Sequence, residues 1–545
     1  MHPLKLLLAE RIRDGLKRKA VTSESRWAET YRQMGQPFAG NYSFDYHPWA
    51  RAMHDCPDEM MVGQKGAQLG YTEVALNKAF YNIDILGNSV LYVLPTTNDA
   101  SAFSSSRFDP ALELSPHLRK LFSEVKNVGH KRAGSANLFV RGSRGRSGLK
   151  SVPVSVAIVD ELDEMVQENI ALIDERMSGQ LTKQMFLLST PTIEHYGINA
   201  YYEQSSQDHW FFPCPLCSRR TELTFPECLV ITADSWSDPG ITDSHLICKE
   251  CKGVLSHENK RDYLSRGHWV AGRTDCNIRG FHISQLYSST VKPSALALSF
   301  LKGQTSPSDE QEFYNSKLGL PHEPEGSRIS DADIHSCTAG YKMVPNASPA
   351  SLVTMGVDVG KVLHYEITAY SVDKNNPDVS LASKGKILKV GKLLHFEELD
   401  AKMKDYGVNY CVIDANPETR KAREFAQRFW GRVRLCYYAH GVSGKAINIH
   451  PQEQHSIAVD RTVWLDISMG RLKQRRIALP VDLPIEYQDH LKALVRITKK
   501  DASGNPVGSY KNTGEDHYAH ARNYNEIALK LAASYAQSSN IGHIF

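Results

Sequence analysis

The first chemically informative segment is Lys65-Gly66-Ala67-Gln68-Leu69-Gly70-Tyr71-Thr72, between a short apolar run and a helical pattern. Such a loop of small residues lets backbone N–H groups close around phosphate oxygens, and the helix N-terminus adds partial positive charge. Thr72 supplies a hydroxyl for Mg²⁺. The usual G-x-x-x-x-G-K-[ST] pattern is altered, because Lys65 replaces the first glycine and Tyr71 replaces the lysine. A plain turn between strand and helix is the alternative.

A second segment, Ile158-Val159-Asp160-Glu161, ends another apolar run and strengthens the phosphate interpretation. Asp160 would hold Mg²⁺ through water, and Glu161 would polarise the attacking water. An acidic pair at the end of a buried strand is costly unless it has ligands. Ser189 and Thr190 close a further apolar run, and their hydroxyls could sense the γ-phosphate of ATP. A Ser/Thr turn before proline is the alternative for these two.

Phosphoryl transfer also needs a positive charge that offsets the charge of the transferring group. Arg144 and Arg146 lie in a glycine-rich loop before the Asp160 run and are our candidates. A DNA-facing or solvated basic loop is an equally good interpretation. The formal charge of +3 gives no global signature of nucleic-acid binding, so any DNA contact must come from local basic clusters.

Four cysteines form two CxxC pairs, Cys214/Cys217 and Cys248/Cys251, with 30 residues between the pairs. Each CxxC turn presents two thiolates, and two such turns complete a tetrahedral Zn²⁺ shell. Four protein ligands leave no position for water, so we expect a structural zinc site. Disulfides or free thiols are the alternatives.

A set of acidic residues in the last third of the chain predicts a metal-dependent nuclease. Asp358 lies within an apolar run, Asp414 ends another, and Asp516 opens the last helical pattern. On neighbouring strands, two carboxylates can hold two Mg²⁺ or Mn²⁺ ions, one activating water and one stabilising the leaving 3′ oxygen of a phosphodiester. For any single aspartate, a helix cap or a solvated charge is the alternative. His520, one turn after Asp516, could orient a ligand or be an ordinary surface histidine.

The elements that must position these residues are predicted to form two α/β domains. The chain has 545 residues, 41% of them hydrophobic, which suffices for two or three cored domains. Runs at 60–63, 90–94, 154–160 and 185–189 alternate with helical patterns and predict a parallel sheet. There is no signal-peptide pattern and no apolar run of about 18 residues, so we expect a soluble intracellular protein.

The order of these motifs resembles the large subunit of tailed-phage DNA-packaging terminases of the lambda-like, GpA-type family. The resemblance covers roughly residues 40 to 535 and rests on the loop with Lys65 and Tyr71, the Asp-Glu strand end, the four cysteines and the acidic set. Phe313-Tyr-Asn315 with Leu318-Gly319, and Val459-Asp-Arg-Thr462, also look like family segments. Tyr46 resembles an adenine-stacking residue, although a packing tyrosine fits equally well.

The resemblance implies a particular division of the chain. It consists of an N-terminal leader (1–58), an ASCE-type P-loop ATPase core (59–205), a zinc-ribbon insertion (206–285), a connecting region with linker (286–350) and an RNase H-like α/β nuclease domain (351–545). Two departures stand out. Gln68 lies near the place of the family's loop arginine, and His520 stands where the family often has a second aspartate.

The implied function is a viral motor that uses ATP, Mg²⁺ or Mn²⁺ and Zn²⁺. It would pump double-stranded DNA into a procapsid and cut the concatemer, working with a small terminase subunit and the portal protein as a ring homo-oligomer. It would act in the host cytoplasm and be absent from the mature virion. Two other classes remain as alternatives: a helicase-like remodeller whose RNase H-like domain is a non-catalytic scaffold, and a structural capsid-vertex component with a vestigial nucleotide site.

Overall fold

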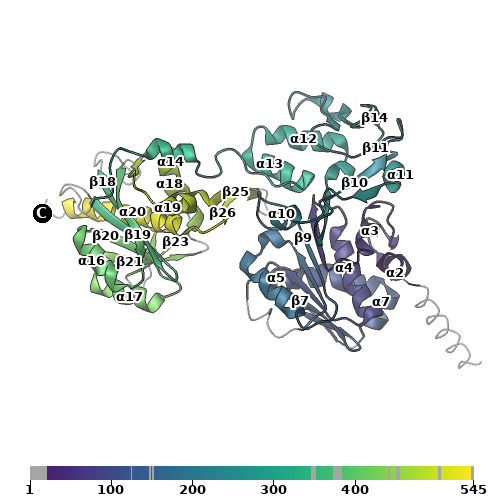
Figure 1. Ribbon diagram of the computed structural model, residues 1–545, viewed down its shortest axis with the longest axis horizontal. Coiled ribbons are helices and arrows are strands. Elements are labelled where there is room, and N and C mark those ends of the chain that lie inside the picture. The colour runs from purple at the N-terminus through teal and green to yellow at the C-terminus, as the bar shows by residue number, and fades with distance from the viewer. Residues whose placement is uncertain are drawn as a thin grey trace, which may run out of the picture. The chain divides into compact units, whose positions relative to one another are not determined.

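The computed structural model consists of two compact units, residues 1–324 and 325–545 (Figure 1). It describes residues 21, 23–123, 125–145, 149, 153–344, 352–371, 383–439, 442, 444–449, 455–500 and 505–541. Within these ranges, no helix combines the length and the apolar character needed to cross a membrane.

The first unit is built on an 11-stranded sheet. Its strand order is β11 (Arg220–Thr221), β10 (Asp208–Pro213), β16 (Ile278–Ile283), β3 (Met60–Lys65), β9 (Gln184–Ser189), β8 (Val156–Asp160), β4 (Val90–Leu94), β7 (Ala136–Gly142), β6 (His130–Ala133) and β5 (Val125–Asn127), with β15 (His268–Val270) beside β10. All neighbours from β10 to β7 are parallel. The parallel sheet predicted from the four apolar runs is confirmed, and the carboxyl ends of its strands share one edge.

Four strands of this sheet, β10, β11, β15 and β16, come from the segment that we assigned to the zinc-ribbon insertion. β10 and β16 pair in parallel with each other, and β16 pairs along its length with β3. Between β10 and β16 the chain adds β11 and β15 to the edge of the sheet, and it leaves the sheet in the segment between β11 and β15. The partner of β16, strand β3, is distant in sequence, so no local pattern indicates that this segment extends the main sheet.

Helices cover both faces of the sheet. The first unit contains α2 (Glu24–Tyr31), α3 (Ala50–His54), α4 (Tyr71–Tyr81), α5 (Thr97–Phe103), α6 (Asp109–Leu114), α7 (Pro116–Leu121), α9 (Ile170–Asp174), α10 (Ile198–Glu203), α11 (Lys260–Ser265), α12 (Pro293–Gly303) and α13 (Pro307–Glu312). Alternate residues of β4 enter two apolar clusters: Val90 and Tyr92 pack with α4, while Leu91 and Val93 pack with α9 and α10. This alternation is the period-2 geometry of a strand buried on both sides.

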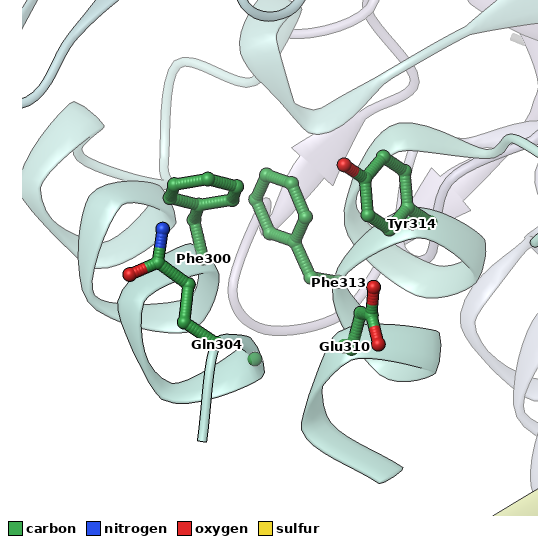
Figure 2. Close-up of a pocket in the computed structure, with 6 residues that line it drawn as sticks. Phe300, Gln304, Glu310, Phe313 and Tyr314 are labelled. Carbon is green, nitrogen blue, oxygen red and sulfur yellow. The ribbon is translucent and has the colours of Figure 1, made fainter. Parts of the chain in front are cut away.

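The segment after β16 packs onto the first unit and ends in η8 (Phe313–Leu318). A small pocket of about 140 Å³ lies between α12, α13 and η8. Figure 2 shows the side chains that line it. Phe313 lies against Phe300 and Phe225, with ring centroids 5.3 and 5.0 Å away. These aromatic contacts fix η8, which approaches the predicted phosphate loop. The remaining short elements of the unit are β1 (Gln33–Met34), β2 (Gly40–Asn41), β12 (Leu229–Val230), β13 (His245–Ile247), β14 (Val254–Leu255), η1 (Asn82–Leu86), η2 (Ser104–Phe108), η3 (Leu162–Glu164), η4 (Gln167–Asn169), η5 (Glu175–Met177), η6 (Pro239–Asp243) and η7 (Gln285–Tyr287).

The second unit has an eight-stranded mixed sheet with an RNase H-like order. The order is β22 (Asn448–Ile449), β23 (Ser456–Val459), β21 (Val433–Tyr438), β20 (Tyr410–Asp414), β17 (Leu352–Val359), β18 (Leu363–Ser371), β19 (Lys384–Leu393) and β24 (Ile477–Ala478). β17, β18 and β19 are antiparallel neighbours, whereas β20 is parallel to β17 and β21 is parallel to β20. Around them lie α14 (Asp331–Cys337), α16 (Glu397–Asp405), α17 (Thr419–Arg428), α18 (Arg461–Lys473), α19 (Ile485–Lys492), the hairpin β25 (Leu494–Lys500) and β26 (Pro506–Asn512), and α20 (His517–Ile541).

Helix α20 packs directly on β17, and Gly356 makes this approach possible. A Cβ atom at Gly356 would lie 2.0 Å from the Ala521 carbonyl oxygen and 2.2 Å from the Asn525 nitrogen. Buried polar groups fix the position further: Arg522 pairs with Glu366 at 3.0 Å, both fully buried. Because the helix is held this tightly, the residues at its N-terminus have defined positions over the end of β17.

Candidate active sites

The predicted phosphate loop connects β3 to α4 through two residues in the left-handed region. Gln68 has φ 60° and Gly70 has φ 86°. A Cβ atom at Gly70 would also lie 3.1 Å from the His47 ring. Glycine is favoured here because it adopts positive φ without steric cost. Gly70 precedes the first turn of α4, where the unpaired N–H groups of a helix gather.

The first two amides of the loop are occupied by protein carbonyl groups. Gly66 N–H donates to the Ile283 carbonyl at 2.9 Å, and Ala67 N–H donates to the Ser316 carbonyl at 2.7 Å. Gln285 Nε2 donates to the Ala67 carbonyl at 2.9 Å. In this conformation, a phosphate group would be bound by amides further along, in the turn at Gln68 and the first turn of α4.

Three side chains of the loop differ in their surroundings. Tyr71 is 1% exposed, and its ring lies against Gly63, where a Cβ atom would be only 2.7 Å from it. The Tyr71 side chain therefore belongs to the core, and the predicted contact of Tyr71 with nucleotide would have to be made by its backbone. Leu69 is equally buried, and its carbonyl accepts a bond from Trp49 Nε1 at 3.0 Å. Thr72 is half-buried in the first turn of α4.

Asp160 and Glu161 lie at the carboxyl end of β8 beside Lys65. Lys65 Nζ is 3.8 Å from Glu161 Oε1, and the Glu161 side chain is 45% exposed. Asp160 is 2% exposed. Its Oδ2 accepts a hydrogen bond from the Tyr92 hydroxyl at 2.6 Å, while its buried Oδ1 has no hydrogen-bond partner among the described residues.

This arrangement fits a hydrated Mg²⁺ ion at Asp160. Burial, together with the charge of Glu161, raises the pKa of Asp160 to about 6, although Lys65 acts in the opposite direction. A buried carboxylate oxygen without a partner is costly, and water molecules bound to a magnesium ion would satisfy it. Lys65 then lies where it could bind phosphate, and the exposed Glu161 carboxylate lies where it could contact the attacking water.

Ser189 differs from the prediction for the γ-phosphate sensor. Its hydroxyl is buried, accepts from Asp163 N–H at 3.2 Å and donates to the Thr190 carbonyl at 3.1 Å. It is therefore committed to the turn after Asp160-Glu161 and could report on phosphate only through that turn. Thr190 is half-buried, and its contact with the γ-phosphate stays a prediction. Sequence reasoning missed Asp163, whose carboxylate accepts N–H bonds from Thr192 and Ile198 at 2.8 Å each.

The segment around η8 connects the phosphate loop to the Ser189–Thr192 turn. Gln64 Nε2 donates to the Gly319 carbonyl at 3.0 Å. Asn315 Nδ2 donates to the Thr192 carbonyl at 2.9 Å. Gly319 has φ 67°, and a Cβ atom there would lie 2.5 Å from the Gly66 nitrogen. In the sequence, this segment stood out only through its resemblance to a family segment.

The other predicted nucleotide contacts have mixed outcomes. Tyr46 is half-buried; the Arg261 guanidinium lies 4.9 Å above its ring, and the Phe38 ring centroid is 4.4 Å away. Adenine stacking on Tyr46 would have to compete with these contacts. Arg144 is exposed and follows β7, whose carboxyl end lies at the edge that carries Asp160. Arg146 lies outside the described residues.

The four cysteines of the CxxC pairs converge, with all four sulfur atoms within 4.8 Å of one another. Cys214 Sγ and Cys251 Sγ are 4.0 Å apart, close to the roughly 3.8 Å that two ligands span in a tetrahedral site with Zn–S bonds of about 2.3 Å. Leu216 N–H and Glu250 N–H donate to the first sulfur of each pair. The four thiols therefore fit a zinc ion.

Removing one of these thiols should expose the role of the metal. In the full-length chain, we expect one zinc per molecule, and Cys248→Ser should lower both the zinc content and the melting temperature, because metal binding contributes to folding. Cys276→Ser is the matched control, since Cys276 lies in the same unit but outside the cluster. Elemental analysis and thermal melting measure the two effects. Zinc-free protein with an unchanged melting temperature would contradict the assignment.

Asp358 and Asp414 lie next to each other in the second unit. The parallel pair β17 and β20 aligns Val357 with Ile413, so the following residues are neighbours at the strand ends. Burial raises the pKa of Asp414 to about 6, and the charge of Asp358 adds to this increase. A divalent cation would relieve the repulsion between the two carboxylates, so they fit a metal site.

The structure does not bring Asp516 together with Asp358 and Asp414 as one set of metal ligands. Among the described residues, no group of potential ligands within 4.8 Å contains Asp358, Asp414 and Asp516 together. Asp516 Oδ2 is 3.3 Å from His520 Nε2. Burial opposes ionisation of Asp516, but His520 and Arg461 together bring its pKa below the usual value. His520 also acts electrostatically on Asp414, and its ring nitrogen Nδ1 lies 3.0 Å from the Tyr438 hydroxyl.

Two histidines missed by sequence reasoning lie beside Asp358. His517 Nδ1 is 2.9 Å from Asp358 Oδ2, and the His364 ring stacks on the His517 ring at 4.7 Å. His364 faces Asp358 directly across β17 and β18. No local motif marks these residues, because each reaches the site only through the sheet register and the position of α20.

The fold and the two sites define the class of protein as an α/β unit with a phosphate-loop site, followed by a unit of RNase H-like strand order with an acidic site. Residues 37–269 match the phage terminase large subunit gpA ATPase domain. Residues 278–533 match the terminase large subunit gpA endonuclease domain. The chain belongs to the gpA family of phage terminase large subunits.

Individual relatives are distant in sequence. The terminase large subunit of Enterobacteria phage P21 is 22% identical over 334 residues, which is 54% of this chain and 51% of the relative. That of Escherichia phage lambda is 21% identical over 332 residues, with the same coverage of both chains. The chain thus spans about half the length of the curated relatives it matches. The crystal structure of the HK97 bacteriophage large terminase gives a TM-score of 0.48 at 10% identity, covering 93% of this chain and 99% of that one.

Proposed function

We propose that this chain is a DNA-packaging motor that moves double-stranded DNA with ATP and cuts it with a two-metal endonuclease. One observation carries the proposal: a single chain holds a buried Asp160 oxygen without a partner beside Lys65 and Glu161, and also the adjacent carboxylates of Asp358 and Asp414. The first group suits nucleotide hydrolysis and the second suits phosphodiester hydrolysis.

In the ATPase site, we assign each group the step that its surroundings favour. Lys65 and the amides after Ala67 bind the phosphates, and Thr72 with Asp160 holds Mg²⁺. Glu161 orients and deprotonates the attacking water, because its carboxylate is exposed while Asp160 is not. Arg144, or the neighbouring Arg146, offsets the charge of the transferring phosphoryl group.

The bond network around Asp163 supports a route from hydrolysis to movement. Ser189 accepts the Asp163 N–H, Asp163 holds Thr192, and Asn315 holds Thr192 from the η8 segment. The same segment contacts the start of the phosphate loop. We infer that loss of the γ-phosphate at Glu161 shifts this connected set, with Ser189 and Thr190 as its first members.

In the nuclease site, Asp358 and Asp414 would hold the metal ions, and Asp516 would complete the shell. The bound metals supply an activated water and a positive charge for the leaving oxygen. His520 keeps Asp516 in place, since its ring contacts Asp516 and accepts or donates a bond at the Tyr438 hydroxyl at 3.0 Å. The four CxxC thiolates hold a structural zinc ion.

The partners follow from the family and from the proposed activity. We propose that the chain works with a small terminase subunit and docks on the portal of a procapsid as a ring of identical subunits. It would act in the host cytoplasm and leave before the virion matures. Family membership supports each of these assignments.

A triplex-displacement assay tests the central proposal with the purified chain alone. We expect ATP-dependent displacement of a triplex-forming oligonucleotide from linear duplex DNA, with the two strands of the duplex left paired. Supercoiled plasmid should be cleaved when Mg²⁺ or Mn²⁺ is present. Strand separation with intact plasmid would favour the helicase-like alternative and reject the packaging motor. Absence of ATP hydrolysis would favour a vestigial nucleotide site.

A further inference from the structure

A second set of potential metal ligands lies on the other side of Asp358 from Asp414. One ligand atom each of Asp358, His364 and His517 all lie within 4.8 Å of one another. Asp358 and His364 are direct partners across β17 and β18, so their side chains share one face of the sheet. His517 begins α20, which crosses β17 at Gly356. Three elements thus bring one carboxylate and two imidazoles together.

His364 is the unusual member of this set. The residue is 5% exposed, and neither of its ring nitrogens has a hydrogen-bond partner among the described residues. A buried polar group without a partner lowers stability, and native proteins rarely keep one without a reason. Its ring is fixed by stacking on His517, with 10° between the ring planes. Its nitrogens are therefore buried, positioned and available to a ligand.

The geometry suits a single metal ion. Ligands in adjacent positions around an ion with bonds of about 2.1 Å lie roughly 3 Å apart. The contact between His517 Nδ1 and Asp358 Oδ2 is 2.9 Å. Two imidazole nitrogens with one carboxylate favour divalent transition metals, whereas Mg²⁺ prefers oxygen ligands.

A neighbouring group of Glu486, His490 and Glu515 is less suited to bind the ion. His490 Nδ1 already accepts the Tyr518 N–H at 3.2 Å. Glu515 is 74% exposed, and its oxygen is 3.5 Å from His490 Nε2. Exposed acidic groups of this kind are common without a metal. Glu486, His490 and Glu515 therefore lie near the first set of ligands but are not assigned as ligands.

We propose that Asp358, His364 and His517 bind one divalent transition metal ion, adjacent to the Asp358–Asp414 pair. The nuclease centre would then hold this ion in preference to Mg²⁺ at one of its positions. This last consequence rests on the proposed nuclease function, because Asp358 is shared between the two sets. Binding of the ion by Asp358, His364 and His517 does not depend on the nuclease function, and it can be measured without DNA.

Pulsed electron paramagnetic resonance on the full-length, zinc-loaded chain tests the proposal, with Mn²⁺ as the probe and no nucleotide present. We expect one tightly bound Mn²⁺ that shows nitrogen hyperfine coupling from imidazole and persists in excess Mg²⁺. His364→Asn and His517→Asn should each weaken Mn²⁺ binding by at least about tenfold, since losing even an outer-shell partner costs roughly 10- to 100-fold. Each variant should also reduce the nitrogen coupling.

His455→Asn is the matched control, because this histidine is in the same unit and has ring nitrogens without a partner, but belongs to no group of potential ligands. It should bind Mn²⁺ as the wild type does. Bound Mn²⁺ without nitrogen coupling, or Mn²⁺ displaced by equimolar Mg²⁺, would overturn the proposal even if plasmid is cleaved. Nitrogen coupling in a chain that cleaves no DNA would support the metal site and reject the nuclease function.

Discussion

Glu161→Gln should leave ATP binding intact and slow ATP hydrolysis by roughly 10²- to 10⁴-fold, the usual cost of losing a general base. Glutamine keeps the size of the side chain but cannot take a proton from water. Asp160 and Lys65, which we assign to Mg²⁺ and phosphate, remain unchanged. Steady-state phosphate release measures the hydrolysis, and equilibrium binding of a fluorescent ATP analogue measures the affinity.

The structure offers a matched control for this change. Glu164 follows three residues later in η3 and is exposed, so Glu164→Gln introduces the same chemical change away from Lys65. We expect near-normal turnover for Glu164→Gln. Near-normal turnover for Glu161→Gln would remove Glu161 from the mechanism and leave the buried Asp160 without a catalytic partner.

Asp358→Ala should abolish plasmid cleavage while DNA-stimulated ATP hydrolysis stays within a few-fold of the wild type. Removing this carboxylate withdraws a charged ligand from the metals and leaves them mispositioned. Asp358 belongs to the second compact unit, whereas Lys65 and Asp160 belong to the first. Plasmid linearisation with Mn²⁺ and phosphate release with linear DNA, measured on the same full-length preparation, separate the two activities.

Asp405→Ala provides the control for Asp358→Ala, since Asp405 is an exposed carboxylate at the end of α16 in the same unit. It should leave both activities unchanged. The converse change, Lys65→Ala, should stop ATP hydrolysis while plasmid cleavage continues. If Asp358→Ala instead destroys ATP hydrolysis and cleavage persists, the two units have been assigned the wrong activities.

Local sequence patterns identified the groups that carry the proposed chemistry. Asp160-Glu161 is recognisable because it directly follows four apolar residues, the pattern of an acidic pair at the end of a buried strand. The CxxC spacing is recognisable because one turn presents two thiolates. The parallel sheet of the first unit could be predicted from its apolar runs, because a strand that is buried on both faces is apolar at nearly every position. These properties depend on neighbours within a few residues.

Contacts between distant segments could not be predicted in this way. β10 and β16 join the sheet only because β16 aligns with β3, far away in sequence. The burial of the Tyr71 ring depends on Gly63 beneath it. Carbonyl groups of Ile283 and Ser316 occupy two amides of the phosphate loop. The strand pairing, the burial of Tyr71 and the occupied amides all depend on packing between distant segments. Residue type and spacing do not predict such packing.

The nuclease centre shows the same division most clearly. The sequence by itself determined that Asp358 lies within an apolar strand and that Asp414 ends another, because a charged residue beside a buried run is a local signal. Only the tertiary structure decided which side chains surround them. The sheet register places His364 opposite Asp358, and the absent side chain of Gly356 lets α20 bring His517 to the same carboxylate. Several ligands must lie within a few ångströms of one another to hold one ion, and residues so far apart in sequence are brought to that distance only by the folded chain.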